Sequence, residues 1–207
     1  EIGDAGGLVA DWNLMTNLEG YFAAGDALFA ANYHYHAATT GRYAGRKAAN
    51  YAEKMKITPL NREQVEKEKA WVYKPLENRE EIEWKELNAA ACRIMQNYCG
   101  EYKNEELLQL ALISLKDLRE NDAPRVCADN PHKLMRTLEV HNILTCDEMI
   151  VHASMARKAS SDVLGFNRLD YPAVDPPEWK TWIVLRNDDG QVRTRKMPLD
   201  FWTPLAA

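Results

Sequence analysis

The amino-acid sequence predicts a mainly α-helical fold: an antiparallel bundle of three to four helices, preceded by a strand–helix remnant of an α/β domain and followed by a C-terminal β-hairpin. Three observations favour this fold class. Apolar residues recur at helical spacing between residues 80 and 159. A short apolar run near residue 21 ends in Gly and precedes a helix of small residues. An Asp-Gly pair separates two strand-like runs near the C-terminus.

The first predicted region, residues 1–57, contains most of the glycines in the chain. Within it, residues 21–25 form a compact apolar run consistent with a short buried strand, and Asp26 follows at the carboxyl end of that strand. Residues 37–56 predict a helix whose small side chains allow close approach to a sheet or a ligand. This region therefore has the order strand, loop, helix.

The second predicted region, residues 58–165, is the helical bundle. Its densely charged start predicts a solvated helix, and three further segments place apolar residues on one helical face. The predicted helices cover residues 62–69, 80–99, about 104–120 and 131 to about 159. Short connections between them favour antiparallel neighbours.

The third predicted region, residues 166–207, is an extended tail. Prolines 172, 176 and 177 stiffen its first part. Residues 181–186 and 191–197 then read as strands that flank Asn187-Asp188-Asp189-Gly190, which is a hairpin signal.

Composition excludes several classes of protein. The net charge of −5 disfavours a nucleic-acid binder with a broad basic footprint. No apolar run approaches the ~20 residues of a transmembrane helix, and no secretory signal opens the sequence. The four cysteines form no Cys-x-x-Cys pair, so we expect small buried residues in a reducing cytoplasm.

The residues best suited to binding or catalysis lie between the predicted strand and the helix that follows. Gly25 and Asp26 end the strand, and a loop of aromatic and imidazole side chains, Tyr33-His34-Tyr35-His36, leads into the helix. A strand-to-helix junction gathers free backbone N–H groups and the positive end of the helix dipole. An acid at the carboxyl end of a strand binds ribose or ribityl hydroxyls. Together these features predict a cofactor site.

These segments resemble the second FAD-binding motif of the fumarate reductase, succinate dehydrogenase and adenylylsulfate reductase flavoprotein superfamily. Ala24-Gly25-Asp26 and Gly41-Arg42-Tyr43-Ala44-Gly45 stand where that family has its apolar strand and its Gly-Arg-x-Ala-Gly helix. Upstream, Gly6-Gly7-Leu8-Val9-Ala10-Asp11 is similar to the strand that precedes the motif. Downstream, Ala156-Arg157-Lys158-Ala159-Ser160-Ser161 and Arg168-Leu169-Asp170-Tyr171-Pro172 resemble two motifs of the C-terminal bundle. The four motifs occur in family order along nearly the whole chain.

The resemblance implies an FAD-dependent oxidoreductase that exchanges two electrons between flavin and a small-molecule substrate. It also implies an iron–sulfur electron-transfer subunit as partner. Asp26 would hold the ribityl chain, and His34 and His36 would lie where flavin and substrate meet, donating a hydrogen bond or transferring a proton. The predicted cofactor-binding residues are Gly25, Asp26, Tyr33, His34, Tyr35 and His36. The alternative for both histidines is packing within the loop.

One position departs from the family pattern. Succinate and fumarate enzymes carry an Arg after the loop Asn to clamp a substrate carboxylate, but here Tyr33 follows Asn32. Tyr cannot supply a bidentate carboxylate contact, which argues against a dicarboxylate substrate. The loop and residues 157–171 are closer to adenylylsulfate reductase alpha-subunit-like proteins.

Basic residues concentrate toward the C-terminus and allow two interpretations. They form either a solvated surface or a docking face for an acidic electron-transfer partner. The residues are Arg157, Lys158, Arg168, Arg193 and Arg195. Arg136 and Glu139 have the spacing of a simple helix pair.

The family's flavoproteins also need an N-terminal Gly-x-Gly-x-x-Gly turn and a capping domain, and neither pattern occurs in these residues. We therefore expect a C-terminal part with an incomplete FAD site, inactive alone, that requires the N-terminal FAD-binding and capping region. Alone it would expose an apolar patch near residues 21–29 and bind FAD weakly or not at all. The main alternative is a non-catalytic helical interaction or assembly module. A helical metal protein built on His141 and His152 is more distant, because no third ligand is evident.

Overall fold

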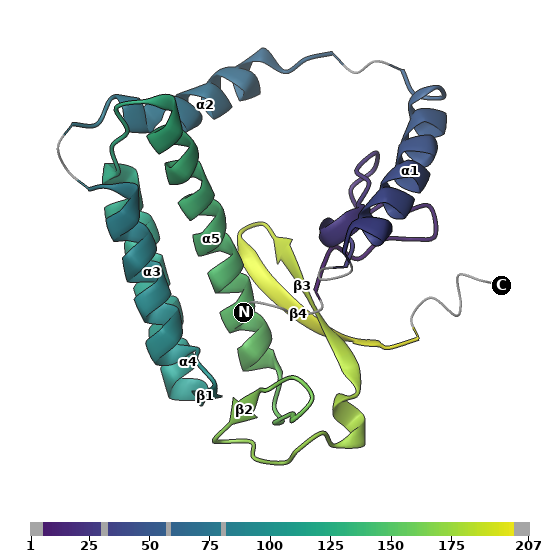
Figure 1. Cartoon of the computed structure of the whole chain (residues 1–207), viewed down its shortest axis with the longest axis vertical. Coiled ribbons are helices and arrows are strands. Elements are labelled where there is room, and N and C mark those ends of the chain that lie inside the picture. Colours follow the sequence, from purple (N-terminus) through teal and green to yellow (C-terminus); the bar gives the residue numbers. More distant parts are fainter. Residues whose placement is uncertain (1–5, 30–32, 57–58, 80–81, 201–207) are drawn as a thin grey trace. The chain divides into compact units, whose positions relative to one another are not determined.

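The computed structural model describes residues 6–29, 33–56, 59–79 and 82–200. The chain divides into two compact units. We call residues 1–60 with 198–207 the N-terminal unit, and residues 61–197 the bundle unit. Figure 1 labels the helices and strands of both.

The N-terminal unit is built from a looped segment, a 3-10 helix (Gly25–Ala27) and the helix α1 (Tyr33–Ala52). The strand predicted over residues 21–25 is reduced to a single antiparallel bridge, Met15 to Phe22. A regular strand needs partners along its length, and within residues 6–29 the chain supplies only isolated bridges. Tyr21 and Phe29 are exposed, as expected for an apolar patch, whereas Ala23 between them is buried.

Helix α1 begins four residues earlier than predicted. The segment 33–36, expected to be a loop, forms its first turn, because aromatic and imidazole side chains tolerate a helix and Thr40 hydrogen-bonds back to the carbonyl of His36. Tyr33 enters the helix with a φ of 58°, in the left-handed region. The helix ends at Ala52 instead of residue 56.

The core of the bundle unit lies between α3 (Trp84–Tyr98), α4 (Glu105–Asp117) and α5 (Pro131–Ala156), which run side by side in Figure 1. Each buries an apolar stripe against the other two, and a π-helical turn (Leu118–Asp122) extends α4. The fully buried core residues include Ala91, Leu108, Ala111, Leu115, Val126, Leu144 and Val151. The predicted fold class, a helical bundle followed by a hairpin, is confirmed.

Asparagine side chains begin three helices of the bundle unit. Asn61, Asn104 and Asn130 each accept a hydrogen bond from the amide three residues later, at the starts of α2 (Arg62–Tyr73), α4 and α5. This satisfies one of the free N–H groups at each helix start. Helix α2 buries none of its residues, as its dense charge predicted.

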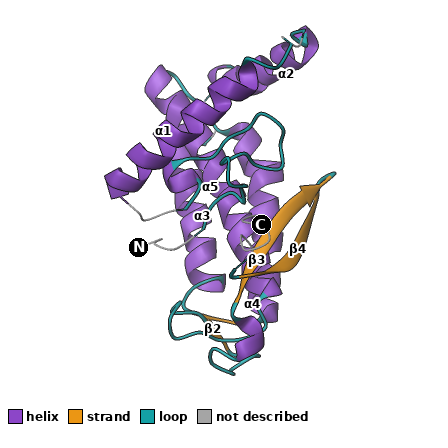
Figure 2. Cartoon of the chain, turned by 90° about the vertical axis from the view of Figure 1, so that its right-hand side faces the viewer, coloured by secondary structure: helices purple, strands orange, loops and turns teal. Residues whose placement is uncertain are grey.

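Strands complete the bundle unit. A short parallel pair, β1 (Tyr102–Lys103) and β2 (Asn167–Arg168), joins distant parts of the sequence. The predicted hairpin is confirmed as β3 (Thr181–Asp188) and β4 (Gln191–Pro198), seen in orange in Figure 2. Its two turn residues, Asp189 and Gly190, both have positive φ, as a type I′ turn requires.

A helix spans a bilayer only where it is both long and apolar. Within the described ranges, no helix combines the length and apolar content that crossing a membrane requires.

Candidate functional site

The candidate cofactor site in the N-terminal unit centres on the contact between the Gly25–Ala27 turn and the first turns of α1. Gly25 is buried and adopts a φ of +60°, where a side chain would be strained. Its amide donates to Thr40 Oγ1 at 2.9 Å, and the Thr40 hydroxyl donates to the carbonyl of His36 at 2.6 Å. The structure thus brings Gly25 and His36 together through Thr40.

The other predicted site residues surround this contact with their side chains open to solvent. Asp26, in the 3-10 turn, and His34 are exposed. Tyr33 and Tyr35 are 76% and 70% exposed. Neither tyrosine therefore serves the packing of the N-terminal unit, and both are available to a ligand or to a further part of the protein.

His36 differs from its neighbours in the first turn of α1. Its ring is half-buried, and Nδ1 is shielded from solvent with no hydrogen-bond partner among the described residues. A buried polar atom without a partner is uncommon in folded proteins. The first turn of α1 also holds no acidic residue to offset the positive end of the helix dipole. These observations fit a polar or anionic group bound beside His36.

Two upstream residues of this unit have structural roles. Gly7 packs so closely against residues 27 and 28 that an added Cβ would overlap the carbonyl oxygen of Leu28. The Asp11 carboxylate accepts hydrogen bonds from the amides of Asn13 and Met15 at 2.8 and 3.0 Å and so shapes a turn. Asp11 therefore organises its own loop.

Among the described residues of the bundle unit, Arg168 is the most deeply buried charged one, at 1% exposure. Its guanidinium makes a bidentate contact with Asp170, with both distances 2.8 Å, and a third contact with Glu105 at 3.1 Å. It also donates to the carbonyls of Ser154 and Arg157 at the end of α5. These hydrogen bonds hold the pKa of Asp170 at about 2, well below its usual range.

Arg168 thereby ends α5 three residues before the predicted boundary and supports the start of α4. The carbonyls of Ser154 and Arg157 bond the guanidinium, and the Asp170 carboxylate accepts from the amide of Glu105 at 2.9 Å. The prediction that Arg168 belongs to a solvated surface or a docking face is wrong. Its donors satisfy free carbonyls at the end of α5, while Asp170 satisfies an amide at the start of α4.

Arg157 is also buried, at 8% exposure, so the same prediction is wrong for it. Its guanidinium carbon lies 6.0 and 5.8 Å from the ring centroids of Phe166 and Trp179. The side chain donates to the carbonyl of Trp179 at 3.2 Å, and Asp175 lies 3.8 Å away. Burial lowers the pKa of Arg157. It anchors the tail to the end of the bundle by cation–π packing.

A second group of shielded ionisable side chains comes from the end of α3, from β1 and from α5. Lys103 is 5% exposed, and its ammonium lies 4.4 Å from the Phe166 ring centroid. Burial lowers the pKa of Lys103 and raises the pKa of the Cys99 thiol. On α5, burial also raises the pKa of Asp147 to about 6. The neutral thiol is a poor nucleophile, so this group has the chemistry of a packed interior.

The histidines of α5 do not form a metal centre with other side chains of the described ranges. There, no group of three or more His, Cys, Asp or Glu residues is placed to hold a metal ion. The His141 ring packs against Trp71 at 5.5 Å between centroids, and burial lowers its pKa. The four cysteines are free, and Cys92 and Cys146 are exposed, which corrects the expectation that all four are buried.

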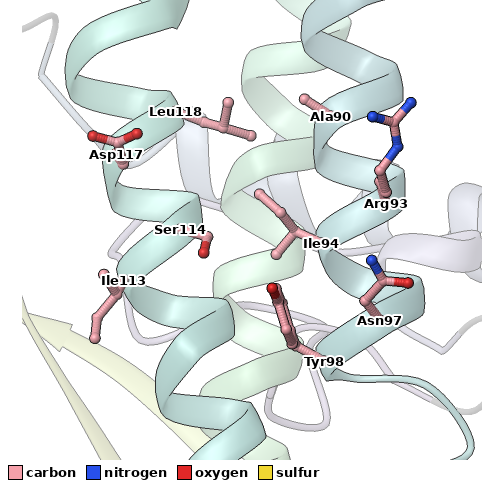
Figure 3. A pocket seen from close by; sticks show the side chains of 9 residues that line it. All are labelled: Ala90, Arg93, Ile94, Asn97, Tyr98, Ile113, Ser114, Asp117 and Leu118. Atoms are coloured by element: carbon pink, nitrogen blue, oxygen red, sulfur yellow. The ribbon is translucent and has the colours of Figure 1, made fainter.

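A shallow groove of about 470 Å³ lies between α3 and α4 (Figure 3). Ile94, Ser114 and Leu118 point between the two helices, whereas Arg93 and Asp117 point away from each other on the outer sides. The groove therefore presents a mixed apolar and polar surface. Its walls bring no nucleophile and base together.

Comparison with known proteins identifies the family. The profile described as the fumarate reductase flavoprotein C-terminal family matches residues 88–205, more than half of the chain. The chain belongs to this family. The matched residues include most of α3, all of α4 and α5, and the hairpin, while the candidate site around Gly25 and His36 precedes them.

Individual relatives are similar to this chain over its N-terminal unit as well. The fumarate reductase flavoprotein subunit of Haemophilus influenzae is 25% identical over 212 residues, covering 94% of this chain and 35% of that protein. A solved adenosine-5-phosphosulfate reductase in complex with sulfite has a TM-score of 0.79 at 28% identity, covering 90% of this chain and 33% of its own.

The fold is also found in an E. coli quinol fumarate reductase FrdA variant, with a TM-score of 0.77 at 23% identity over 95% of this chain and 36% of that one. This family member thus spans about a third of the length of its relatives. Because the relatives are fumarate and phosphosulfate reductases, it belongs to a flavoprotein oxidoreductase family.

Two residues with evident roles were not predicted as such. Arg168 stands two positions before Asp170, and this spacing of opposite charges was the available signal for a pair. Thr40 stands four positions after His36, a spacing at which a hydroxyl reaches the helical carbonyl. Its contact with Gly25 has no sequence signal, because it depends on where the turn packs.

Proposed function

We propose that this chain forms the C-terminal part of an FAD-dependent oxidoreductase subunit that exchanges two electrons between flavin and a small-molecule substrate. The observation that carries the proposal is the family match over residues 88–205. The N-terminal FAD-binding and capping region of the same protein supplies the rest of the site, since the chain spans about a third of its relatives. An iron–sulfur subunit is the proposed electron-transfer partner.

The N-terminal unit supplies one wall of the proposed flavin site. The exposed Asp26 carboxylate accepts hydrogen bonds from ribityl hydroxyls, and the first turn of α1 favours negative charge on the cofactor. The remaining cofactor contacts come from Gly25, Tyr33, His34, Tyr35 and His36. FAD, when bound, supplies the two-electron chemistry.

The two histidines are the proposed catalytic residues. His36 Nδ1, shielded and without a partner among the described side chains, is placed to exchange a hydrogen bond or a proton with a bound group. His34 lies two residues before His36 in the first turn of α1. Its exposed side chain reaches a substrate on the solvent side. Because Tyr33 replaces the carboxylate-clamping Arg, we propose a substrate other than a dicarboxylate.

A reconstitution experiment tests the proposal. The chain is purified alone and together with the N-terminal FAD-binding and capping region, and FAD binding is measured by flavin fluorescence. We expect stoichiometric binding only with both parts, and an affinity roughly ten-fold weaker for Asp26→Ala, which removes a charge-assisted hydrogen bond.

Glu53→Ala provides the matched control, because Glu53 is an exposed acid beyond the other end of α1. It should leave FAD affinity unchanged. Tight FAD binding by the chain alone would contradict the proposal that its FAD site is incomplete. Equal affinity for Asp26→Ala and the unmodified chain would remove Asp26 from it.

The second candidate function is a non-catalytic helical interaction module. The observation that favours it is the α3–α4 groove of about 470 Å³, beside which Leu110 and Ile113 are 47% and 66% exposed. In this alternative the groove receives the apolar ridge of a partner helix. A reconstituted pair that binds no FAD would leave this module as the supported function.

A further inference from the structure

We propose that Thr40 is a positioning residue of the flavin site: its hydroxyl fixes the Gly25–Ala27 turn against the first turn of α1 and so sets where Asp26 and His36 lie relative to each other. The inference rests on the proposed function and names the residue that organises its site. Thr40 itself lies one turn into the helix and is half-buried, so it acts through its neighbours.

The hydrogen-bond geometry gives the hydroxyl a fixed orientation. A hydroxyl has one proton and two lone pairs. The Thr40 proton goes to the carbonyl of His36 at 2.6 Å, which leaves a lone pair to accept the Gly25 amide at 2.9 Å. One side chain therefore connects two backbone positions that are eleven residues apart in sequence.

The Gly25 amide depends on this acceptor. Gly25 is buried, and a buried backbone N–H without a partner is strongly disfavoured. Its φ of +60° lies in the left-handed region, outside the conformations of regular helices and strands, and its amide donates to the Thr40 hydroxyl. An ideal Cβ at Gly25 would touch Ala37 at 3.4 Å, so the turn is already in contact with α1 and the hydrogen bond sets its orientation.

The same bond affects both proposed ligand groups. Asp26 directly follows Gly25, so rotation of the Gly25 peptide reorients the Asp26 carboxylate. His36 accepts through its carbonyl, so its backbone is held in the first turn of α1 while Nδ1 stays shielded. Loss of the hydroxyl should therefore loosen both groups together, without removing either.

Three variants test the proposal. Thr40→Val keeps the shape and removes the hydroxyl, Thr40→Ser restores the hydroxyl, and Thr39→Val alters the neighbouring exposed threonine as a matched control. Each is studied in the chain by NMR hydrogen exchange of the Gly25 amide and by the imidazole signals of His36. Each is also combined with the N-terminal FAD-binding region for measurement of the FAD dissociation constant.

We expect Thr40→Val to accelerate Gly25 exchange and to weaken FAD binding, each by roughly ten-fold, as loss of one hydrogen bond to a buried amide implies. Thr40→Ser should restore both, and Thr39→Val should change neither. FAD affinity that is unchanged in Thr40→Val would overturn the positioning role, whatever happens to the exchange rate.

The unmodified chain provides a test that requires no variant to fold. Its Gly25 amide should exchange much more slowly than the amides of the exposed residues Glu19 and Gly20, and free exchange would overturn the inference. Failure of the unmodified chain to bind FAD with the N-terminal region would instead reject the proposed function itself. The two failures are therefore distinguishable.

Discussion

At the scale of single residues, Arg168 shows how a charged side chain is stabilised in the protein interior. Removing a guanidinium from water is costly, and the cost is offset only where every donor finds a good acceptor. Here Asp170, Glu105 and the end of α5 together provide those acceptors. Asp170 is two residues away, but Glu105 is 63 residues away and the carbonyls of Ser154 and Arg157 are 14 and 11 residues away, so Arg168 joins three parts of the bundle unit.

We predict that Arg168→Met destabilises the protein by about 3–5 kcal/mol, because it leaves two carboxylates and several carbonyls without their partner. Urea denaturation measures the loss. Since the Asp170 pKa is about 2 and its unfolded value is near 3.8, the stability from this contact should be present above pH 4 and be lost as the pH falls toward 2.

Arg186→Met is the control for this prediction. Arg186 pairs with Asp188, but its side chain is 71% exposed, so the pair is screened by solvent. The variant should change stability by less than about 1 kcal/mol. Equal effects of the two substitutions would contradict the role assigned to Arg168.

Asp147 predicts a pH dependence of opposite sign. Burial raises its pKa to about 6, so the folded protein holds this proton more tightly than the unfolded chain. The resulting loss of stability grows as the pH rises from about 4 through 6. Asp147→Asn should therefore stabilise the protein by about 1–2 kcal/mol at pH 8 and have little effect at pH 4.

Thermal unfolding of the two proteins at pH 4 and pH 8 measures this difference. Asp117→Asn, which changes an exposed acid on α4, should alter stability little at either pH. A stabilisation by Asp147→Asn that is the same at both pH values would assign the effect to packing instead of ionisation.

At the scale of elements, segments with a regular apolar period predicted helices and strands better than segments without one. α3, α4, α5 and the hairpin follow their predicted ranges within a few residues, because each has a repeated apolar period and clear end signals. α1 was placed four residues late, since Tyr33 to His36 carry no apolar period. The prediction of a regular strand over residues 21–25 was wrong, because an apolar run does not show whether neighbouring strands are available to pair with it.

The asparagine at the start of α4 allows a quantitative test at this scale. Asn104 Oδ1 accepts the amide of Leu107 at 2.9 Å, so Asn104→Ala should cost about 1 kcal/mol of stability. Thermal unfolding followed by far-UV circular dichroism measures the loss. Asn97→Ala, in the exposed part of α3, should be neutral or slightly stabilising because Ala favours helices.

At the scale of the whole molecule, the sequence motifs predicted family membership correctly, while the positions of charged groups required the structure. Four motifs in order are specific, and the family match over residues 88–205 confirms the family and contains the two downstream motifs. The cofactor contacts of Gly25, Asp26 and Tyr33 to His36 stay predictions. Arg157 and Arg168 were misplaced because a basic residue in a sequence gives no sign of the aromatic rings and carbonyls that will enclose it.

The parallel contact between β1 and β2 also has a kinetic consequence. The hydrogen bond from the Glu105 amide to Asp170 closes a loop of 65 residues, whereas α4 packs against α3 and α5, the helices that precede and follow it in the sequence. Non-local contacts form slowly, and synthesis proceeds from the N-terminus. On the ribosome, α3, α4 and α5 should therefore collapse first, with the start of α4 and the end of α5 joined only after residue 170 has emerged.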